Sequence, residues 1–207
     1  MTTSPLTTLV LATGNAGKVR ELREIFGNVP LDLKSLRDFS GISDVEETGS
    51  TFVENASLKA AGFAVQTKQF CLADDSGLEV KALGNAPGVY SARFAGAGTG
   101  YDTKIERLFE MMRQSGSDDR RARFVCAMAL ANVRGEVIHT VQAECAGTIA
   151  YEARGTNGFG YDPVLIPEKF DQTFGELGDD VKRSISHRAK AAELIIRYLL
   201  DFISPLT

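Results

Sequence analysis

The chain has 207 residues, of which 43% are hydrophobic and 24% charged, a balance typical of a globular domain with a substantial core. Its net charge of −4, from 23 Lys and Arg against 27 Asp and Glu, argues against a nucleic-acid polymer as partner, because no basic excess exists to neutralise a phosphate backbone. A single nucleotide needs only a few local cations and backbone amides and remains compatible with this charge.

Several sequence features indicate the compartment. No run approaches the ~20 apolar residues that span a bilayer, and Met1–Pro5 lacks the basic flank and apolar core of a signal peptide. Cys71, Cys126 and Cys145 lie far apart in apolar surroundings, which favours buried free thiols in a reducing environment. We therefore expect a cytoplasmic protein with one domain over residues 1–207.

The first predicted elements are a strand over residues 7–12 and a helix over residues 19–26. The loop between them contains two glycines and ends at Lys18, so that its amides, the helix N-terminus and the lysine can bind phosphate. It is not a Walker A loop, because the glycines are too closely spaced and no Ser or Thr follows Lys18. A strand–helix turn without a ligand is the alternative interpretation.

A further strand is expected around residues 31–36, and Thr51 with Glu54 predicts a capping box that starts the next helix. Lys59 lies on that helix, and its neighbour one turn earlier is Asn55. A solvated lysine is the ordinary outcome on a helix. Only the other polar groups of the predicted site make Lys59 a phosphate candidate. Glu46 and Glu47 precede the cap and are candidates to supply a second carboxylate to a metal.

The apolar run 70–72 leads directly into Asp74 and Asp75, followed by Ser76 and Gly77. We expect a buried strand that ends at the two carboxylates, the edge at which α/β proteins bind ligands. Because side chains alternate along a strand, the two carboxylates should point in opposite directions, Asp75 to a cleft and Asp74 to the scaffold. Such a carboxylate can hold Mg²⁺ or take a proton from water. An acidic turn is the alternative.

In the middle of the chain, Asp102 is expected to cap a helix whose buried side chains include Ile105 and Leu108. Residues 124–133 and 137–149 are β-prone and flank a short turn, which predicts an antiparallel hairpin. His139 lies in the second of these strands and is expected to be structural or exposed rather than a ligand.

The last third contains two polar clusters. In the glycine-rich loop 155–163, Phe159 can stack on a flat base and Asp162 can accept hydrogen bonds from it. Residues 182–188 contain Lys, Arg and His side chains and are expected just before a strongly amphipathic helix, where they can meet an anion or a base edge. A generic basic cap is the alternative, which the helix dipole disfavours.

Taken in order, these stretches resemble the inosine triphosphate pyrophosphatase family, and the similarity runs from about residue 9 to about residue 200. Each stretch is weak alone, but the ordered set is specific. The matching segments are 12–18, 46–56, 73–78, 86–93, 159–163 and 186–188. The resemblance implies an α/β fold with an elongated mixed β-sheet flanked by helices, and two lobes around a central nucleotide-binding cleft. It also implies a homodimer that uses Mg²⁺ to hydrolyse a purine nucleoside triphosphate to the monophosphate and pyrophosphate.

The same resemblance implies roles for individual residues. Asp75 would activate water, and Glu46 and Asp75 would hold the metal. The implied substrate-binding residues are Thr13, Gly14, Asn15, Ala16, Gly17, Lys18, Lys59, Ser76, Phe159, Gly160, Tyr161, Asp162, Lys182, His187 and Arg188.

Substrates of this family, hypoxanthine and xanthine nucleotides, carry a 6-keto acceptor that His187 or Arg188 can meet with a donor, whereas adenine would leave that donor unpaired. Two alternatives remain at this point. One is a nucleotide-binding regulatory module without turnover, which leaves the acidic residues without a purpose. The other is a phosphohydrolase acting at the terminal phosphate.

Overall fold

The computed structural model describes residues 7–96 and 98–203. Met1–Pro5, which we examined for a signal peptide, lies outside these residues. In the described part of the chain, one mixed sheet of six strands has the order β2-β1-β3-β4-β5-β6. The strands are β1 (Thr8–Leu11), β2 (Asp32–Ser35), β3 (Phe70–Val80), β4 (Arg121–Ala131), β5 (Val137–Ile149) and β6 (Leu165–Pro167). The helices are α1 (Ala16–Ile25), α2 (Phe52–Thr67), α3 (Tyr101–Ser115), α4 (Asp179–Ile185) and α5 (His187–Ile203).

The fold is the α/β arrangement of a mixed sheet flanked by helices that the sequence predicts, and it divides into two compact units. The described residues of the first unit are 7–75, 126–142 and 190–203, and those of the second unit are 76–125 and 143–189. Among these residues, no helix is both long and apolar enough to cross a membrane.

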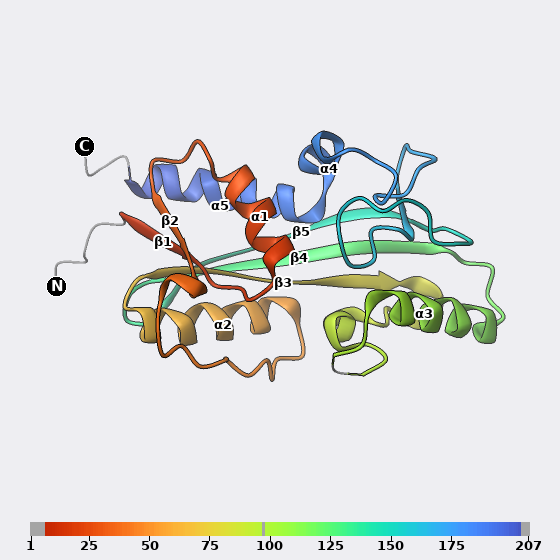
Figure 1. Cartoon of the computed structure of the whole chain (residues 1–207), viewed down its shortest axis with the longest axis horizontal. Helices are drawn as coiled ribbons and strands as arrows, with labels where there is room; N and C mark the ends of the chain where they lie inside the picture. Colours follow the sequence, from red (N-terminus) through yellow and green to blue (C-terminus); the bar gives the residue numbers. More distant parts are fainter. Residues whose placement is uncertain (1–6, 97, 204–207) are drawn as a thin grey trace. The chain divides into compact units, whose positions relative to one another are not determined.

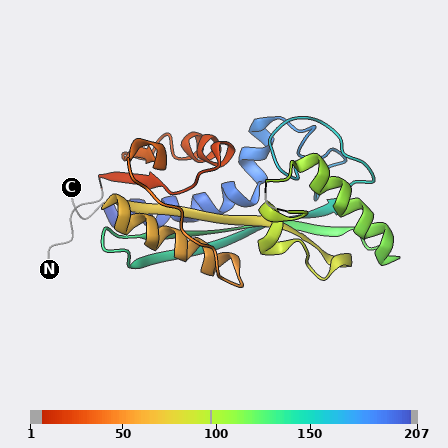
Figure 2. The same ribbon diagram turned by 60° about the horizontal axis from the view of Figure 1, so that its bottom comes forward.

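In the first unit, β1 pairs in parallel with β2 and with β3. Figures 1 and 2 show α1 and α2 on opposite sides of β3. The residues Leu9, Val10 and Leu11 of β1 are completely buried, as expected for a strand covered on both faces. Helix α2 begins with the predicted capping box, in which Thr51 Oγ1 accepts from the Glu54 amide and Glu54 accepts from the Thr51 amide.

The point where β1 ends determines where the two aspartates lie. Leu11 pairs with Leu72, and the amide of Ala12 donates to Leu72 O, after which the chain leaves the sheet. Strand β3 does not stop there, so the expected strand end at Asp74 and Asp75 is wrong. The run continues because Leu78 and Val80 are buried in the next part of the strand. The aspartates therefore lie within β3, immediately beyond the end of its neighbour β1.

The second unit has its own core, built on α3. Ile105, Leu108 and Met112 of that helix pack into one cluster with Leu78 and Val80 of β3. Helix α3 begins after Gly100, so the expectation that Asp102 caps it is wrong: Asp102 lies in the first helical turn, where an acidic side chain also stabilises the helix.

The predicted hairpin between β4 and β5 is confirmed. The Asn132 amide donates to Glu136 O, and at the far end of the two strands the Ile149 amide donates to Arg120 O. His139 stacks on Tyr198, with ring centroids 4.0 Å apart, which agrees with the structural role expected for it.

Candidate functional site

The loop that follows β1 is shaped by Asn15. Its Oδ1 accepts from the amides of Gly17 and Lys18 at 2.9 and 3.2 Å, which caps the N-terminus of α1, and its own amide donates to Thr13 Oγ1. Gly14 and Asn15 are exposed. The loop is therefore a stable, accessible turn in which Asn15 has a defined structural role besides any contact to phosphate.

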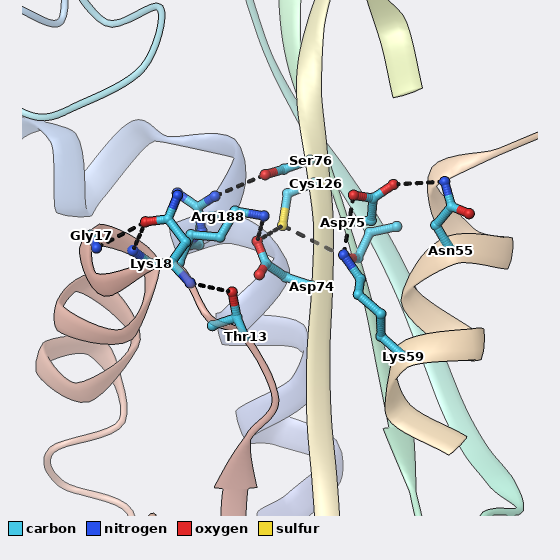
Figure 3. Close-up of polar contacts among 12 residues, drawn as sticks. Thr13, Gly17, Lys18, Asn55, Lys59, Asp74, Asp75, Ser76, Cys126 and Arg188 are labelled. Atoms are coloured by element: carbon cyan, nitrogen blue, oxygen red, sulfur yellow. Dashed lines mark hydrogen bonds and ion pairs between the residues drawn. The ribbon is translucent and has the colours of Figure 1, made fainter. Parts of the chain in front are cut away.

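Asp74 and Asp75 point to opposite sides of β3, as strand alternation predicts (Figure 3). On one side, Asp74 Oδ2 lies 3.0 Å from Lys18 Nζ and 3.9 Å from Cys126 Sγ. On the other side, Asp75 accepts from Asn55 Nδ2 at 3.2 Å and from Lys59 Nζ at 3.3 Å. Both carboxylates are buried, with exposed fractions of 1% and 6%, and each has a lysine partner. Asp74 was expected to face the scaffold only. It also forms an ion pair with Lys18, the lysine of the predicted phosphate-binding loop.

Lys59 Nζ also lies 3.1 Å from Glu47 Oε1, so this ammonium lies between two carboxylates. The segment that carries Glu47 is anchored by the Gly49 amide, which donates to Asn55 Oδ1 at 2.8 Å. A Cβ at Gly49 would lie only 2.7 Å from that oxygen, so the close approach requires glycine. Glu46, the metal ligand implied by the resemblance, is exposed.

Burial raises the pKa of the Asp75 carboxyl, and Lys59 and Lys18 oppose this shift only in part. Burial acts in the opposite sense on the pKa of Lys59, but the carboxylates of Asp75, Asp74 and Glu47 outweigh it, so that this pKa lies above its usual range. The cluster consequently combines a fixed ammonium with a carboxylate that is more basic than an ordinary aspartate.

In the second unit, Asp162 organises the glycine-rich loop. Its Oδ2 accepts from the Phe159 amide at 2.7 Å and lies 2.5 Å from Lys182 Nζ. Lys182 Nζ also lies 4.7 Å from the centroid of the Phe159 ring. Gly158 has φ +73°, and a Cβ there would lie 2.0 Å from Asp162 Oδ2, so the turn closes only with glycine.

Arg188 joins this cluster from α5. Its guanidinium carbon lies 5.5 Å from the centroid of the Phe159 ring, and its Nη2 donates to Ser76 Oγ at 2.9 Å. His187 is 5% exposed and its ring lies 4.8 Å from that of Phe124. An aromatic ring beside two cations and a buried histidine form a suitable environment for a flat, polar heterocycle.

The position of this cluster in the helices differs from the expectation. Lys182 is part of a separate short helix, α4, and His187 is the first residue of α5 rather than one that precedes it. Ser186 separates the two helices, and its Oγ accepts from the Ala189 amide as a cap of α5.

The predicted residues thus fall into two groups, each in one unit. Lys18, Lys59 and Asp75 belong to the first unit, and Phe159, Asp162, Lys182, His187 and Arg188 belong to the second. The sequence indicated Glu47 as a metal candidate, but it assigned no binding role to Asn55 and only a scaffold role to Asp74. The four-residue spacing from Asn55 to Lys59 is the signal that could have identified Asn55, because it puts both on one face of α2.

Comparison with known proteins identifies the family. The sequence matches the Ham1 family over residues 9–198, nearly the whole chain, and the chain belongs to this family. It is 47% identical over 186 residues to the dITP/XTP pyrophosphatase of Bacillus cereus, covering 88% of this chain and 90% of that protein. It is 45% identical over 195 residues to the dITP/XTP pyrophosphatase of Exiguobacterium sibiricum, covering 94% and 98%.

Solved structures agree with this assignment. A HAM1 protein from Coxiella burnetii is 38% identical and matches with a TM-score of 0.85, covering 94% of this chain and 99% of that one. The Ham1 protein of Staphylococcus aureus, also 38% identical, matches with a TM-score of 0.82 over 93% and 98% of the two chains.

Proposed function

We propose that this chain is a hydrolase that converts non-standard purine nucleoside triphosphates (ITP, dITP and XTP) to the monophosphate and pyrophosphate, and so removes them from the nucleotide pool. The relatives at 45–47% identity are dITP/XTP pyrophosphatases, and they cover most of this chain. The observation that carries the proposal within the structure is the buried Asp75, bound by Lys59 and Asn55. A regulatory module without turnover would need no such basic carboxylate.

Two sets of residues fit the two ends of a nucleotide. Lys18 and Lys59 are cations of the first unit that suit the triphosphate, as Thr13 and Asn15 suit it with hydrogen-bonding groups. Phe159 of the second unit suits stacking on the purine, and Asp162, Lys182, His187 and Arg188 suit its polar edge. Of these, His187 and Arg188 are our candidates to donate to the 6-keto oxygen that distinguishes hypoxanthine from adenine.

The acidic residues of the first unit fit Mg²⁺. No group of three or more His, Cys, Asp or Glu side chains gathers as a metal centre among the described residues. Mg²⁺ does not need one, because it usually binds through one or two carboxylates, several waters and the phosphates of its substrate. Lys59 Nζ already places a positive charge between Asp75 and Glu47, which indicates that these carboxylates favour a cation. Asp75 and Glu46 would hold the ion, with Glu47 as the alternative to Glu46.

Bound there with substrate, the ion would neutralise phosphate charge and polarise the linkage that breaks. Asp75 takes a proton from the attacking water, and the contacts from Lys59 and Asn55 hold its carboxylate in position for this step. Lys59 holds Asp75 in position and, with Lys18, counters the charge that accumulates on the phosphates. The bond between the α and β phosphorus groups is the one cleaved, and pyrophosphate leaves.

We also propose that the enzyme is a homodimer and acts in the cytoplasm, where the nucleotide pool is located. The three cysteines are free and buried, as suits a reducing compartment. Light scattering of the purified chain over a range of concentrations tests the dimer, and a constant monomer mass would contradict it.

The proposed function is tested by measuring whether hydrolysis of ITP depends on a divalent metal ion. With excess EDTA, hydrolysis of ITP should stop, and added Mg²⁺ should restore it. Glu46→Gln and Glu47→Gln, compared by the Mg²⁺ concentration needed for half-maximal rate, identify the second ligand: the variant of the true ligand requires more Mg²⁺. Full activity in EDTA, with metal content verified as negligible, would contradict the proposal.

A further inference from the structure

Tyr101, the first residue of α3, is an aromatic side chain that the proposed function leaves without a role. Its ring meets Tyr161 edge to face, with centroids 5.3 Å apart and an interplanar angle of 89°. On the Tyr101 ring lies the ammonium of Lys104, 4.5 Å from the centroid. The ring is therefore held by two partners in a defined position.

Lys104 is unusual for a lysine, because only 4% of it is exposed. Its Nζ donates to Ala92 O at 2.6 Å, and no carboxylate pairs with it within the part of the chain that the structure describes. A buried ammonium with a carbonyl and an aromatic face as its partners is costly. What this arrangement achieves is to fix the Tyr101 ring against the segment that contains Ala92.

The hydroxyl end of Tyr101 lies beside the residues proposed to bind the purine, here called the base cluster (Phe159, Asp162, Lys182, His187 and Arg188). A Cβ built on Gly160 would lie 3.5 Å from Tyr101 Cε1 and 3.8 Å from its Oη, so the ring edge faces the backbone of the 159–162 loop. The charges of Arg188 and Asp162 both act on the Tyr101 phenol, whose pKa burial raises. Yet this hydroxyl forms no hydrogen bond with any residue that the structure describes.

We propose that the hydroxyl of Tyr101 hydrogen-bonds the purine base, which makes Tyr101 a further substrate-contacting residue that helps to determine which base is accepted. The inference rests on the proposed function, because it concerns the same base cluster. Its basis is geometric: a ring fixed by Tyr161 and Lys104 presents a polar group, with no protein partner in the described structure, at Gly160. A phenol so held loses little conformational entropy when it binds.

The competing interpretation is that Tyr101 only fills space between Tyr161 and Gly160. Tyr101→Phe separates the two, because it keeps the ring and its contacts and removes only the hydroxyl. Tyr151→Phe is the matched control, since Tyr151 is 86% exposed and its ring contacts Arg120 outside the base cluster. Both variants should show the thermal midpoint of the parent chain within about 2 °C, which excludes a folding defect as the cause of any effect.

The experiment measures kcat/KM for ITP, XTP and GTP by pyrophosphate release in the parent and both variants. The loss of one hydrogen bond corresponds to about 0.5–1.5 kcal/mol, or roughly a two- to thirteenfold loss. We expect Tyr101→Phe to lower kcat/KM for ITP or XTP by at least threefold. The ratio of that kcat/KM to the kcat/KM for GTP should also change, whereas the values for Tyr151→Phe should equal those of the parent. Values within twofold of the parent for all three nucleotides, or an equal loss for all three, would overturn the proposal.

A second measurement separates this inference from the function on which it rests. If the parent chain releases pyrophosphate from none of the three nucleotides, the proposed function fails, and the calorimetric Kd for ITP then decides the role of Tyr101. A Kd at least threefold weaker in Tyr101→Phe supports a contact to the ligand. An unchanged Kd, or no ITP binding by the parent, overturns it.

Discussion

Lys59 Nζ lies 3.3 Å from Asp75 Oδ1, and the two side chains are only 11% and 9% exposed. The pair joins helix α2 to strand β3, and either charge buried without any partner would cost several kcal/mol. Glu47 adds a second negative charge at 3.1 Å from the same ammonium. Two carboxylates thus surround one ammonium, and the net negative charge that results is one that a divalent cation would balance.

The first prediction concerns Asp75. Asp75→Asn keeps the size of the side chain but removes its basicity and its charge, so kcat for ITP should fall by about 10²–10⁴ from the lost base alone. The protein should stay folded, because Lys59 keeps Glu47 as a partner. Pyrophosphate release and the thermal midpoint, measured on the same preparation, check both parts.

Asp74→Asn is the informative comparison for that variant. Asp74 pairs with Lys18, so its loss should affect the position of that lysine and raise KM for the triphosphate more than it lowers kcat. A folded Asp74→Asn protein without activity, beside an Asp75→Asn protein that turns over ITP normally, would show that the wrong carboxylate is named.

Lys18→Ala should weaken the use of every triphosphate alike, because all substrates share the phosphate chain and Lys18 is assigned to it. We expect KM to rise for both ITP and GTP while the ratio of their kcat/KM values stays constant. Arg20→Ala is a suitable control, as Arg20 is an exposed cation on the same helix. If KM is unchanged but the ITP to GTP ratio shifts, Lys18 belongs to base recognition.

Much of the first unit could be predicted from local signals. The loop 13–18, the cap at Thr51 and the opposite orientation of Asp74 and Asp75 follow from short-range backbone rules. Local signals could not predict where β3 ends, because Ser76 and Gly77 have the composition of a turn. That strand continues for a tertiary reason, namely the burial of Leu78 and Val80 in the core of the second unit.

The buried pair in the second unit leads to a stability prediction. The side chains of Lys182 and Asp162 are 8% and 4% exposed, and Lys182→Met removes the ammonium that lies 2.5 Å from the Asp162 carboxylate. The free energy of unfolding should fall by about 3–5 kcal/mol. Adding Asp162→Asn should recover part of this loss, which denaturant titration of the two variants measures. A double variant less stable than Lys182→Met would show that the charge pair is not the cause.

Cys71 yields a prediction of pH dependence. Burial raises the pKa of its thiol to about 11, whereas an unfolded cysteine titrates near ~8.5. Since the folded value is the higher one, the contribution of Cys71 to stability is complete below that unfolded value and is lost as the pH rises through about 11. The parent should lose more free energy of unfolding between pH 8 and pH 10 than Cys71→Ala does, and equal losses would contradict this account.

The pairings in the site were less predictable than its residue types. The sequence predicted that lysines bind the phosphates and that carboxylates bind the metal, but not which of them contact each other. Glu47 rather than Glu46 contacts Lys59, because the hydrogen bond from Gly49 to Asn55 fixes the turn of that segment. The short contact from Lys182 to Asp162 joins residues 20 positions apart, and no spacing rule predicts such a pair. Tertiary folding sets these partners, whereas the local pattern sets only which groups are available.

The central claim is that this chain cleaves ITP between the α and β phosphorus groups. Incubation with ITP and Mg²⁺, followed by separation of the products, tests it most directly, with Asp75→Asn as the inactive control. The account predicts IMP and pyrophosphate in equal amounts, with ATP consumed far more slowly. Orthophosphate and IDP as the products, or no turnover while ITP binds, would contradict it.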